Sequence, residues 1–217
     1  MLHQSLTTIP AEIRDFREWH HGRTHYAVWV LGCEDNPAIQ AKFKAARAHL
    51  NGYLLEPYDR QPHITLFVCG FLAASARYND DFTLNQVEAQ IQALGSAHIE
   101  AFEIEINGLN SFASAPFLEV QDPDGGIARL RAVLSGAAPE FRTAPYQPHL
   151  TVGLYASAFH SQDVLARMAA FITEPTRWRV ETVTLATYQA SEVVGKLSQR
   201  YRYDLKASSY PASGSGC

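Results

Sequence analysis

The sequence of 217 residues lacks the marks of several common protein classes. It has only three cysteines, Cys33, Cys69 and Cys217, and their separation fits neither a zinc-binding spacing nor a set of paired disulfides. Its 18 basic residues are outnumbered by 22 acidic residues, which gives a formal net charge of −4. Gripping a long nucleic acid requires many Lys and Arg side chains to neutralise phosphates. The composition therefore argues against a long nucleic-acid track and leaves a small anionic ligand or a single RNA terminus as a candidate partner.

Long hydrophobic runs and a secretion signal are also lacking. No apolar segment reaches the roughly 20 residues needed to cross a bilayer, and the first residues show no charged-then-apolar pattern. With the low cysteine content, this predicts a cytoplasmic protein with no membrane partner, and no protein partner is evident. Apolar residues make up 47% of the chain, enough to bury a core. Residues 207–217, "ASSYPASGSGC", are small and polar and predict a disordered tail.

The first half of the chain alternates between strand and helix patterns. Asn36 and Pro37 form a good helix start, and apolar residues then follow at helical spacing. Thr83 with Gln86 predicts a capping box at the start of a second helix. The elements predicted in this half are strands at 25–31, 63–72 and 99–106, with helices that end at Gly52 and Gly95.

The second half repeats the same order of elements. Its predicted strands lie at 116–121, 148–155 and 177–189, with a hairpin partner at 199–205, and its helices follow the turn "DPDGG" and open at Ser161 with Leu165, Met168 and Ile172. A repeat of whole supersecondary units indicates an old duplication whose halves pack about a pseudo-twofold axis. We expect one two-lobed domain over residues 1–206, with lobes at about 25–108 and 116–206.

A short motif occurs once in each half, on the middle strand. "RQPHITLFV" spans residues 60–68 and "YQPHLTVGLY" spans residues 146–155, and both contain Gln-Pro-His-x-Thr. Alternate side chains of a strand face the same side, so each motif presents an imidazole beside a hydroxyl. A lone histidine at a strand end usually has a structural role, but packing does not explain its repetition on equivalent strands. We predict that His63, Thr65, His149 and Thr151 surround one groove.

Two imidazoles that face one small site form a general acid and base pair. Because the unperturbed pKa of histidine is near 6.5, one ring can accept a proton while the other donates one. Displacement at a phosphodiester needs both steps, on opposite sides of phosphorus. The two threonine hydroxyls would hydrogen-bond to the non-bridging phosphate oxygens. This chemistry requires neither a metal nor a cofactor, and the pattern leaves open which histidine is the acid.

The paired "HIT" and "HLT" strands, their place in two similar halves, and the closing "VETVTLATYQ" and "YRYDL" strands carry a family resemblance. Over roughly residues 25–206 the chain resembles the two-histidine (2H) phosphoesterase superfamily, which includes 2′,5′ RNA ligase-like proteins and cyclic nucleotide phosphodiesterases. The resemblance implies a duplicated α+β fold with two pseudo-symmetric lobes whose sheets flank a central active-site cleft. It also implies hydrolysis of a 2′,3′-cyclic phosphate or a 2′,5′ linkage, with the four motif residues as the catalytic residues.

Other residues are weaker candidates for substrate or metal binding. Tyr26 and Tyr155 could stack on a base, although aromatic residues on strands more often belong to the core. Four loop arginines could hold phosphate, although solvated arginines are the default: Arg23, Arg60, Arg77 and Arg142. The segment "HHGRTH", residues 20–25, invites a zinc interpretation, but no Cys, Asp or Glu nearby completes a tetrahedral set. A nucleotide-binding module that keeps the histidines for recognition alone is the main alternative to an enzyme.

Overall fold

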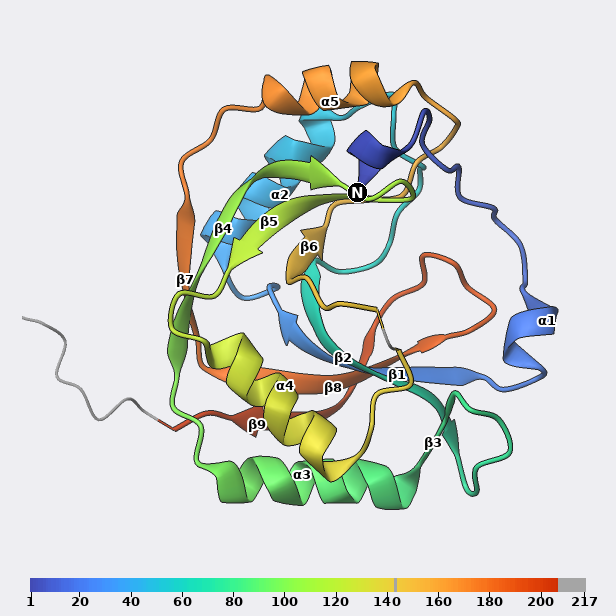
Figure 1. Ribbon diagram of the computed structural model, residues 1–217, viewed down its shortest axis with the longest axis vertical. Helices are drawn as coiled ribbons and strands as arrows, with labels where there is room; N and C mark the ends of the chain where they lie inside the picture. The colour runs from blue at the N-terminus through green and yellow to red at the C-terminus, as the bar shows by residue number, and fades with distance from the viewer. Residues whose placement is uncertain (143, 207–217) are drawn as a thin grey trace, which may run out of the picture.

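The strands of the protein form one continuous hydrogen-bonded sheet, which curls so that its ends approach the same side of the molecule (Figure 1). The computed structural model describes residues 1–142 and 144–206. The tail expected at 207–217 lies outside these residues. No helix in the described part of the chain is both long enough and apolar enough to span a membrane.

The order of helices and strands follows the predicted duplication. Thr83 caps its helix through the expected capping box, and the Asn36 side chain accepts a hydrogen bond from the N–H of Ile39. The elements are η1 (Leu2–Gln4), α1 (Arg17–His20), β1 (His25–Gly32), α2 (Pro37–His49), β2 (His63–Ala73), β3 (Asp81–Thr83), α3 (Leu84–Ala97), β4 (Phe102–Ser111), β5 (Pro116–Gln121), α4 (Gly126–Ala137), β6 (His149–Thr151), α5 (Ser161–Ala169), β7 (Thr176–Val180), β8 (Thr182–Gln189) and β9 (Ser198–Asp204).

The sheet order relates the two halves by symmetry. Its main path runs β7-β4-β5-β6-β2-β1-β8-β9, and β3 pairs with β2 off this path. β4 comes from the first half of the sequence but pairs with β5 and β7, whereas β8 comes from the second half but pairs with β1. Each half therefore contributes its third strand to the other part of the sheet. The two parts of the sheet are interlocked and do not coincide with the sequence ranges 25–108 and 116–206.

Two predicted strands of the second half differ from the structure. The strand expected at 148–155 is only three residues long, because β6 ends at Thr151. The strand expected at 177–189 is two strands that break at Glu181, since β7 pairs with β4 and β8 pairs with β1. The helix expected to include Ile172 ends at Ala169, and the Ile172 side chain is 93% exposed. In all three segments the apolar pattern in the sequence continues past the residue at which the pairing partner changes or the regular structure ends.

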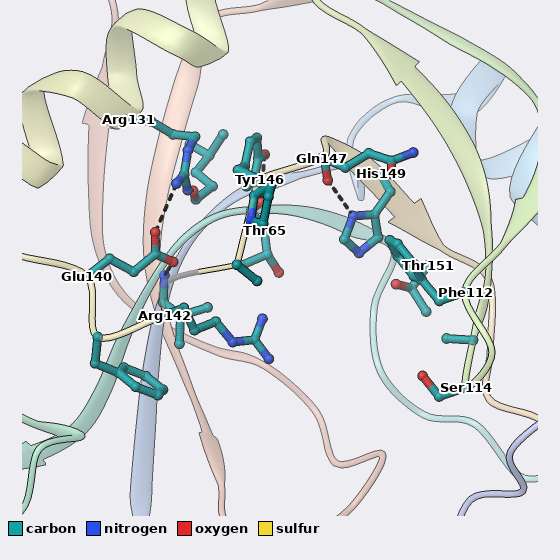
Figure 2. Close-up of a pocket in the computed structure, with 16 residues that line it drawn as sticks. Thr65, Phe112, Ser114, Arg131, Glu140, Arg142, Tyr146, Gln147, His149 and Thr151 are labelled. Atoms are coloured by element: carbon teal, nitrogen blue, oxygen red, sulfur yellow. Dashed lines mark hydrogen bonds and ion pairs between the residues drawn. The ribbon is translucent and has the colours of Figure 1, made fainter. Parts of the chain in front are cut away.

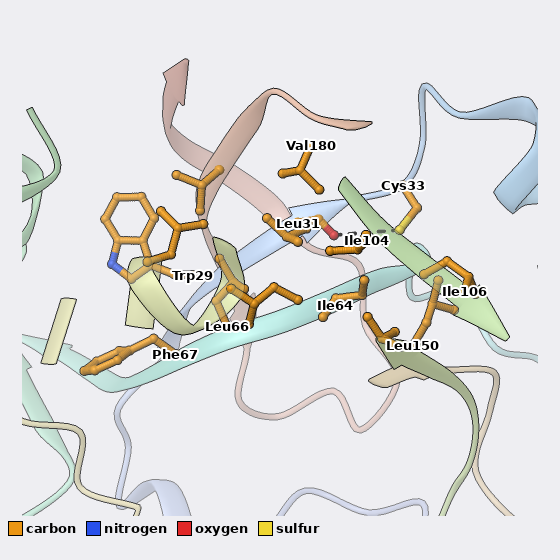
Figure 3. Packing of buried hydrophobic residues seen from close by; sticks show 14 of the residues in the cluster. Trp29, Leu31, Cys33, Ile64, Leu66, Phe67, Ile104, Ile106, Leu150 and Val180 are labelled. Carbon is orange, nitrogen blue, oxygen red and sulfur yellow. Dashed lines mark hydrogen bonds between the residues drawn. The ribbon is translucent and has the colours of Figure 1, made fainter. Parts of the chain in front are cut away.

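One face of the sheet carries the main core and the other face carries the candidate site. Trp29 and Leu31 of β1 pack into the main core with residues of β2, β4 and β6 (Figure 3). Tyr26, Val28 and Val30 point to the opposite face, where they form a smaller cluster. β1 therefore reads as a continuous apolar run because both of its faces are covered. α3 and α4 pack against each other, α4 contacts β2, and α5 contacts β4.

Two glycines of α4 provide a matched test of how this helix packs. A Cβ atom at Gly126 would lie 2.0 Å from Cγ of the buried Phe102 of β4, whereas one at Gly136 would meet nothing within 4 Å. We expect Gly126→Ala to lower the free energy of unfolding by about 1–3 kcal/mol through overpacking. Gly136→Ala should leave it unchanged or raise it by up to about 1 kcal/mol, because alanine favours helix. Urea denaturation measures both values, and equal stability of the two variants would contradict this packing.

Candidate active site

The two motif strands pair directly with each other. Ile64 of β2 lies opposite Leu150 of β6 in an antiparallel register, and both side chains are fully buried in the main core. This register places the histidine of each motif opposite the threonine of the other motif, on the face away from the core. Cross-strand neighbours have Cβ atoms about 5 Å apart and diagonal neighbours about 7–8 Å. The two histidines therefore occupy one diagonal of a small rectangle, and the two threonines occupy the other.

The Gln-Pro residues that precede each histidine fix its imidazole. Nδ1 of His63 lies 2.7 Å from the carbonyl oxygen of Gln61, and Nδ1 of His149 lies 2.7 Å from that of Gln147. A carbonyl oxygen only accepts hydrogen bonds, so Nδ1 must carry the proton in both rings. In the neutral rings Nε2 is then free of a proton. The repeated Gln-Pro-His sequence thus sets the tautomer and orientation of both imidazoles.

Burial keeps both imidazoles uncharged near neutral pH. It lowers the pKa of His63 to about 4. The hydrogen bond to Gln61 opposes this shift, while the charges of Arg60 and His149 add to it. Burial also lowers the pKa of His149, with a smaller contribution from the charge of Arg142.

The polar atoms at the centre of the site face open space. Within residues 1–142 and 144–206, neither histidine Nε2 nor either motif hydroxyl has a hydrogen-bond partner in the protein. His149 and the two threonines line a cavity of about 690 Å³ (Figure 2). His63, Thr65 and His149 line a second cavity of about 450 Å³. The two cavities adjoin each other, because Thr65, His149, Phe141 and Arg142 line both of them.

Side chains cover the open edge of β2 beside the larger cavity. β6 pairs with β2 only at Ile64, so the next polar backbone groups of β2 have no strand partner there. The Tyr146 hydroxyl donates to the carbonyl of Thr65 at 2.9 Å, and the Arg131 guanidinium donates to the carbonyl of Leu66. Glu140 accepts from the N–H of Val68 at 2.9 Å and pairs with Arg131 at 2.9 Å. In Figure 2 this ion pair lies across the cavity from His149 and Thr151.

Aromatic rings and two cationic side chains surround the smaller cavity. Arg60 donates hydrogen bonds to the carbonyls of Gly195 and Val193, and its guanidinium lies 4.2 Å from the centre of the Tyr188 ring. Among the described residues, no carboxylate forms an ion pair with Arg60 or Arg142, so both charges act on the cavity. The aromatic and cationic residues that line it are Trp19, Tyr26, Arg60, Phe141, Arg142 and Tyr188.

The structure separates the two predicted base-stacking tyrosines. Tyr26 lines the smaller cavity beside the motif residues. The prediction for Tyr155 is wrong, because its side chain is fully buried and its hydroxyl bonds to the Ser111 hydroxyl at 2.5 Å. The strand alternation that placed it beside His149 ends with β6 at Thr151, and Tyr155 instead forms a β-bridge with Leu54.

The weaker candidates have other partners. Arg23 forms ion pairs with Asp80 and Asp81, and Arg77 lines neither cavity. In "HHGRTH", His20 accepts from the N–H of Gly22 through Nδ1 and bonds to Asp15 through Nε2. Within the residues that the structure describes, no three or more His, Cys, Asp or Glu side chains form a group that could hold a metal ion.

Sequence reasoning missed several residues of the site. Trp19 and Phe141 line the smaller cavity, and Phe112 packs edge-on against His149 with ring centres 5.0 Å apart. All three lie outside the repeated motif, so only the tertiary contacts connect them with it. Tyr188 lies in the predicted strand 177–189, but only the structure shows that its face of β8 is the one on which Ala186 packs in the cluster of Tyr26.

Comparisons with known proteins agree on one family and one fold. The sequence model described as "2'-5' RNA ligase superfamily" matches residues 35–192. E. coli LigT complexed with 3′-AMP has 16% sequence identity and a TM-score of 0.60, over 84% of this chain and 98% of that chain. E. coli LigT complexed with NADP+ has 18% identity and a TM-score of 0.56, over 85% and 99%. A structure described as a phosphoesterase has 14% identity and a TM-score of 0.54, over 84% and 99%. No curated protein matches the sequence. The structural likeness confirms the predicted α+β fold.

The carbonyl contacts and lowered pKa values predict how the two histidines titrate. In the free protein at pH 7, we expect both rings to be neutral with the proton on Nδ1. Nitrogen-detected NMR distinguishes this tautomer from the Nε2–H form, and a pH titration should show His63 charging near pH 4. The folded state then binds fewer protons than the unfolded state between about pH 6.5 and 4, so stability should fall as pH falls through this window. A neutral Nε2–H tautomer in either ring would contradict the assigned geometry.

Proposed function

Because the chain belongs to the 2′-5′ RNA ligase superfamily, we propose that it is a metal-independent phosphodiesterase. Its substrate is a nucleotide, an RNA end or a cyclic oligonucleotide with a 2′,3′-cyclic phosphate or a 2′,5′ linkage. The observation that carries this proposal is the diagonal arrangement of His63 and His149 across the β2–β6 pair. In-line displacement needs a base and an acid on opposite sides of phosphorus, and a diagonal pair of imidazoles supplies both positions.

The proposed reaction transfers one proton at each imidazole. One neutral Nε2 takes a proton from a water molecule as the water oxygen forms a bond to phosphorus. The other imidazole, protonated at Nε2, gives its proton to the ribose oxygen as the bond from phosphorus to that oxygen breaks. The hydroxyls of Thr65 and Thr151 donate to the non-bridging oxygens, whose charge the transition state retains. After one turnover the base ring has gained a proton and the acid ring has lost one. The cycle closes when the base ring releases its proton to solvent and the acid ring takes one up.

The surroundings of the motif favour a nucleotide as the ligand. The cationic side chains of Arg60 and Arg142 suit an anionic phosphate, and the aromatic lining of the smaller cavity suits a base. Motif residues line both cavities, so there is space beside them for the groups that a phosphodiester joins. The LigT structures of similar fold contain the nucleotides 3′-AMP and NADP+.

A nucleotide-binding module is the second candidate, and the pKa shifts favour it. With both imidazoles neutral near pH 7, the free protein holds little of the protonated ring that an acid catalyst needs. A bound phosphate raises the pKa of a neighbouring imidazole, which restores the acid in an enzyme. Incubation with 2′,3′-cyclic nucleotides, 2′,5′-linked dinucleotides and cyclic dinucleotides separates the candidates, because a binding module turns over none of them.

Substitution of the motif histidines should remove most of the activity. We expect His63→Ala and His149→Ala each to lower kcat by about two to four orders of magnitude, the usual contribution of a positioned acid or base. The double variant should lose much less than the product of the two effects, because acid and base act as a unit. Thr65→Val and Thr151→Val should lower kcat/KM while the fold is retained. Near-normal turnover in either histidine variant, measured on a substrate that the parent hydrolyses, would refute the mechanism.

The pH dependence should be bell-shaped and should differ between the free and the bound protein. Because both imidazole pKa values are lowered, the kcat/KM optimum should lie on the acidic side of pH 6.5 and fall through neutral pH as the acid loses its proton. Substrate phosphate raises both pKa values, so the optimum of kcat should lie at higher pH. Steady-state kinetics over a pH series provides both curves, and both should survive prolonged EDTA treatment. Activity that EDTA removes and zinc restores would point to a metal hydrolase instead.

A further inference from the structure

Trp19 belongs to the N-terminal segment that precedes β1, and it lines the smaller cavity of the candidate site. We call residues 1–24 the N-terminal arm; in Figure 1 it runs from beside α5 to α1. All of it precedes residues 35–192, the range that matches the family model. The arm therefore contributes Trp19 to the lining of the smaller cavity from outside the range that matches the family model.

The arm is held at both ends of its path. Near its start, the Thr8 N–H donates to the carbonyl of Phe159 at 2.9 Å, and the Phe159 N–H donates to the Thr8 hydroxyl at 2.8 Å. The Ala11 N–H donates to the carbonyl of Tyr155 at 2.8 Å. Near its end, Arg23 pairs with Asp80 at 2.6 Å and with Asp81 at 2.7 Å. These contacts fasten the start of the arm to the segment between β6 and α5, and its end to the residues at the start of β3.

Arg23 also holds the backbone next to the indole of Trp19. Its guanidinium donates to the carbonyl oxygens of Trp19 at 3.0 Å and His20 at 2.9 Å. The same guanidinium lies 3.8 Å from the centre of the Phe71 ring. The side chains of Arg23 and Asp80 are each only 13% exposed, so this is a partly buried ion pair with a defined geometry. The backbone of Trp19 is therefore held in place through Arg23 and its ion pair with Asp80.

The indole is nevertheless incompletely covered. Trp19 contacts Tyr26 and Phe71 with ring centres 5.1 and 4.9 Å apart, yet it remains 36% exposed. Its uncovered part lines the smaller cavity together with His63 and His149. A large aromatic ring that is fixed in place and open to a cavity offers a stacking surface for a flat ligand group.

We propose that Trp19 is the outer wall of a nucleobase subsite, so that the base of the bound nucleotide stacks on its indole. This rests on the proposed nucleotide ligand. Tyr26 forms the floor of the subsite, Phe141 and Tyr188 line it, and the motif residues at its inner end hold the phosphate. The arm thereby determines preference for a substrate that carries a base beside the phosphate, whereas the motif alone recognises phosphate.

Tryptophan fluorescence and binding measurements test the subsite without requiring turnover. The chain has three tryptophans: Trp19, the fully buried Trp29, and Trp178 on β7. We expect 3′-AMP to quench the fluorescence of the parent and of the matched control Trp178→Phe, but not that of Trp19→Phe. By calorimetry, Trp19→Ala should weaken 3′-AMP binding about ten- to a hundredfold, the usual effect of losing one stacked base. Inorganic phosphate should bind the parent and Trp19→Ala equally.

The outcomes distinguish a failure of the subsite from a failure of the proposed function. Undiminished binding of 3′-AMP to Trp19→Ala, or equal weakening of 3′-AMP and phosphate, would overturn the stacking role. A parent that binds no 3′-AMP would overturn both the subsite and its nucleotide ligand. Trp19-dependent binding in a protein that hydrolyses nothing would uphold the subsite and refute only the catalytic proposal.

Discussion

The short antiparallel pairing of β2 with β6 is the constraint on which the candidate site depends. Ile64 and Leu150 lie opposite each other with both side chains buried, so the core below the sheet holds the two strands in one register. A slip of one residue would turn the motif side chains toward that core. Because the same pairing joins the two interlocked parts of the sheet, the fold and the site share a single junction. Because β4 and β8 each pair with strands from the other half of the sequence, neither half of the sequence forms its part of the sheet alone.

The symmetry at the junction does not extend to its surroundings. On one side, Arg131, Glu140 and Tyr146 satisfy the unpaired edge of β2 and leave a wide cavity. The smaller cavity instead has an aromatic lining to which Trp19 and Tyr188 contribute, and it also contains Arg60 and Arg142, which form no ion pair with a carboxylate of the described residues. The two halves thus place equivalent imidazoles at the junction, while side chains that differ between the halves, together with Trp19 of the N-terminal arm, give the two cavities different linings.

The electrostatics of the site is consistent with an anionic ligand at its centre. Burial disfavours charge on both imidazoles, and the nearby guanidiniums of Arg60 and Arg142 disfavour it further. A phosphate reverses both effects, since it interacts favourably with the guanidiniums and with a protonated ring. The carbonyls of Gln61 and Gln147 keep each Nε2 directed away from the backbone in either charge state. Binding of an anion would therefore raise the pKa of both imidazoles above their values in the free protein.

The sequence by itself determined the order of most strands and helices in both halves and the repeated motif that brings two histidines and two threonines together. These features are local, because strand alternation, helix caps and a repeated pentapeptide depend on neighbours in the chain. Only the tertiary structure decided that β6 ends at Thr151, that Tyr155 is buried, and that the strand expected at 177–189 divides between two positions in the sheet. It alone brought Trp19 and Phe141 to the motif. The physical reason is that pairing partners and burial arise from contacts between distant segments, and an apolar or aromatic pattern does not specify which segment it will meet.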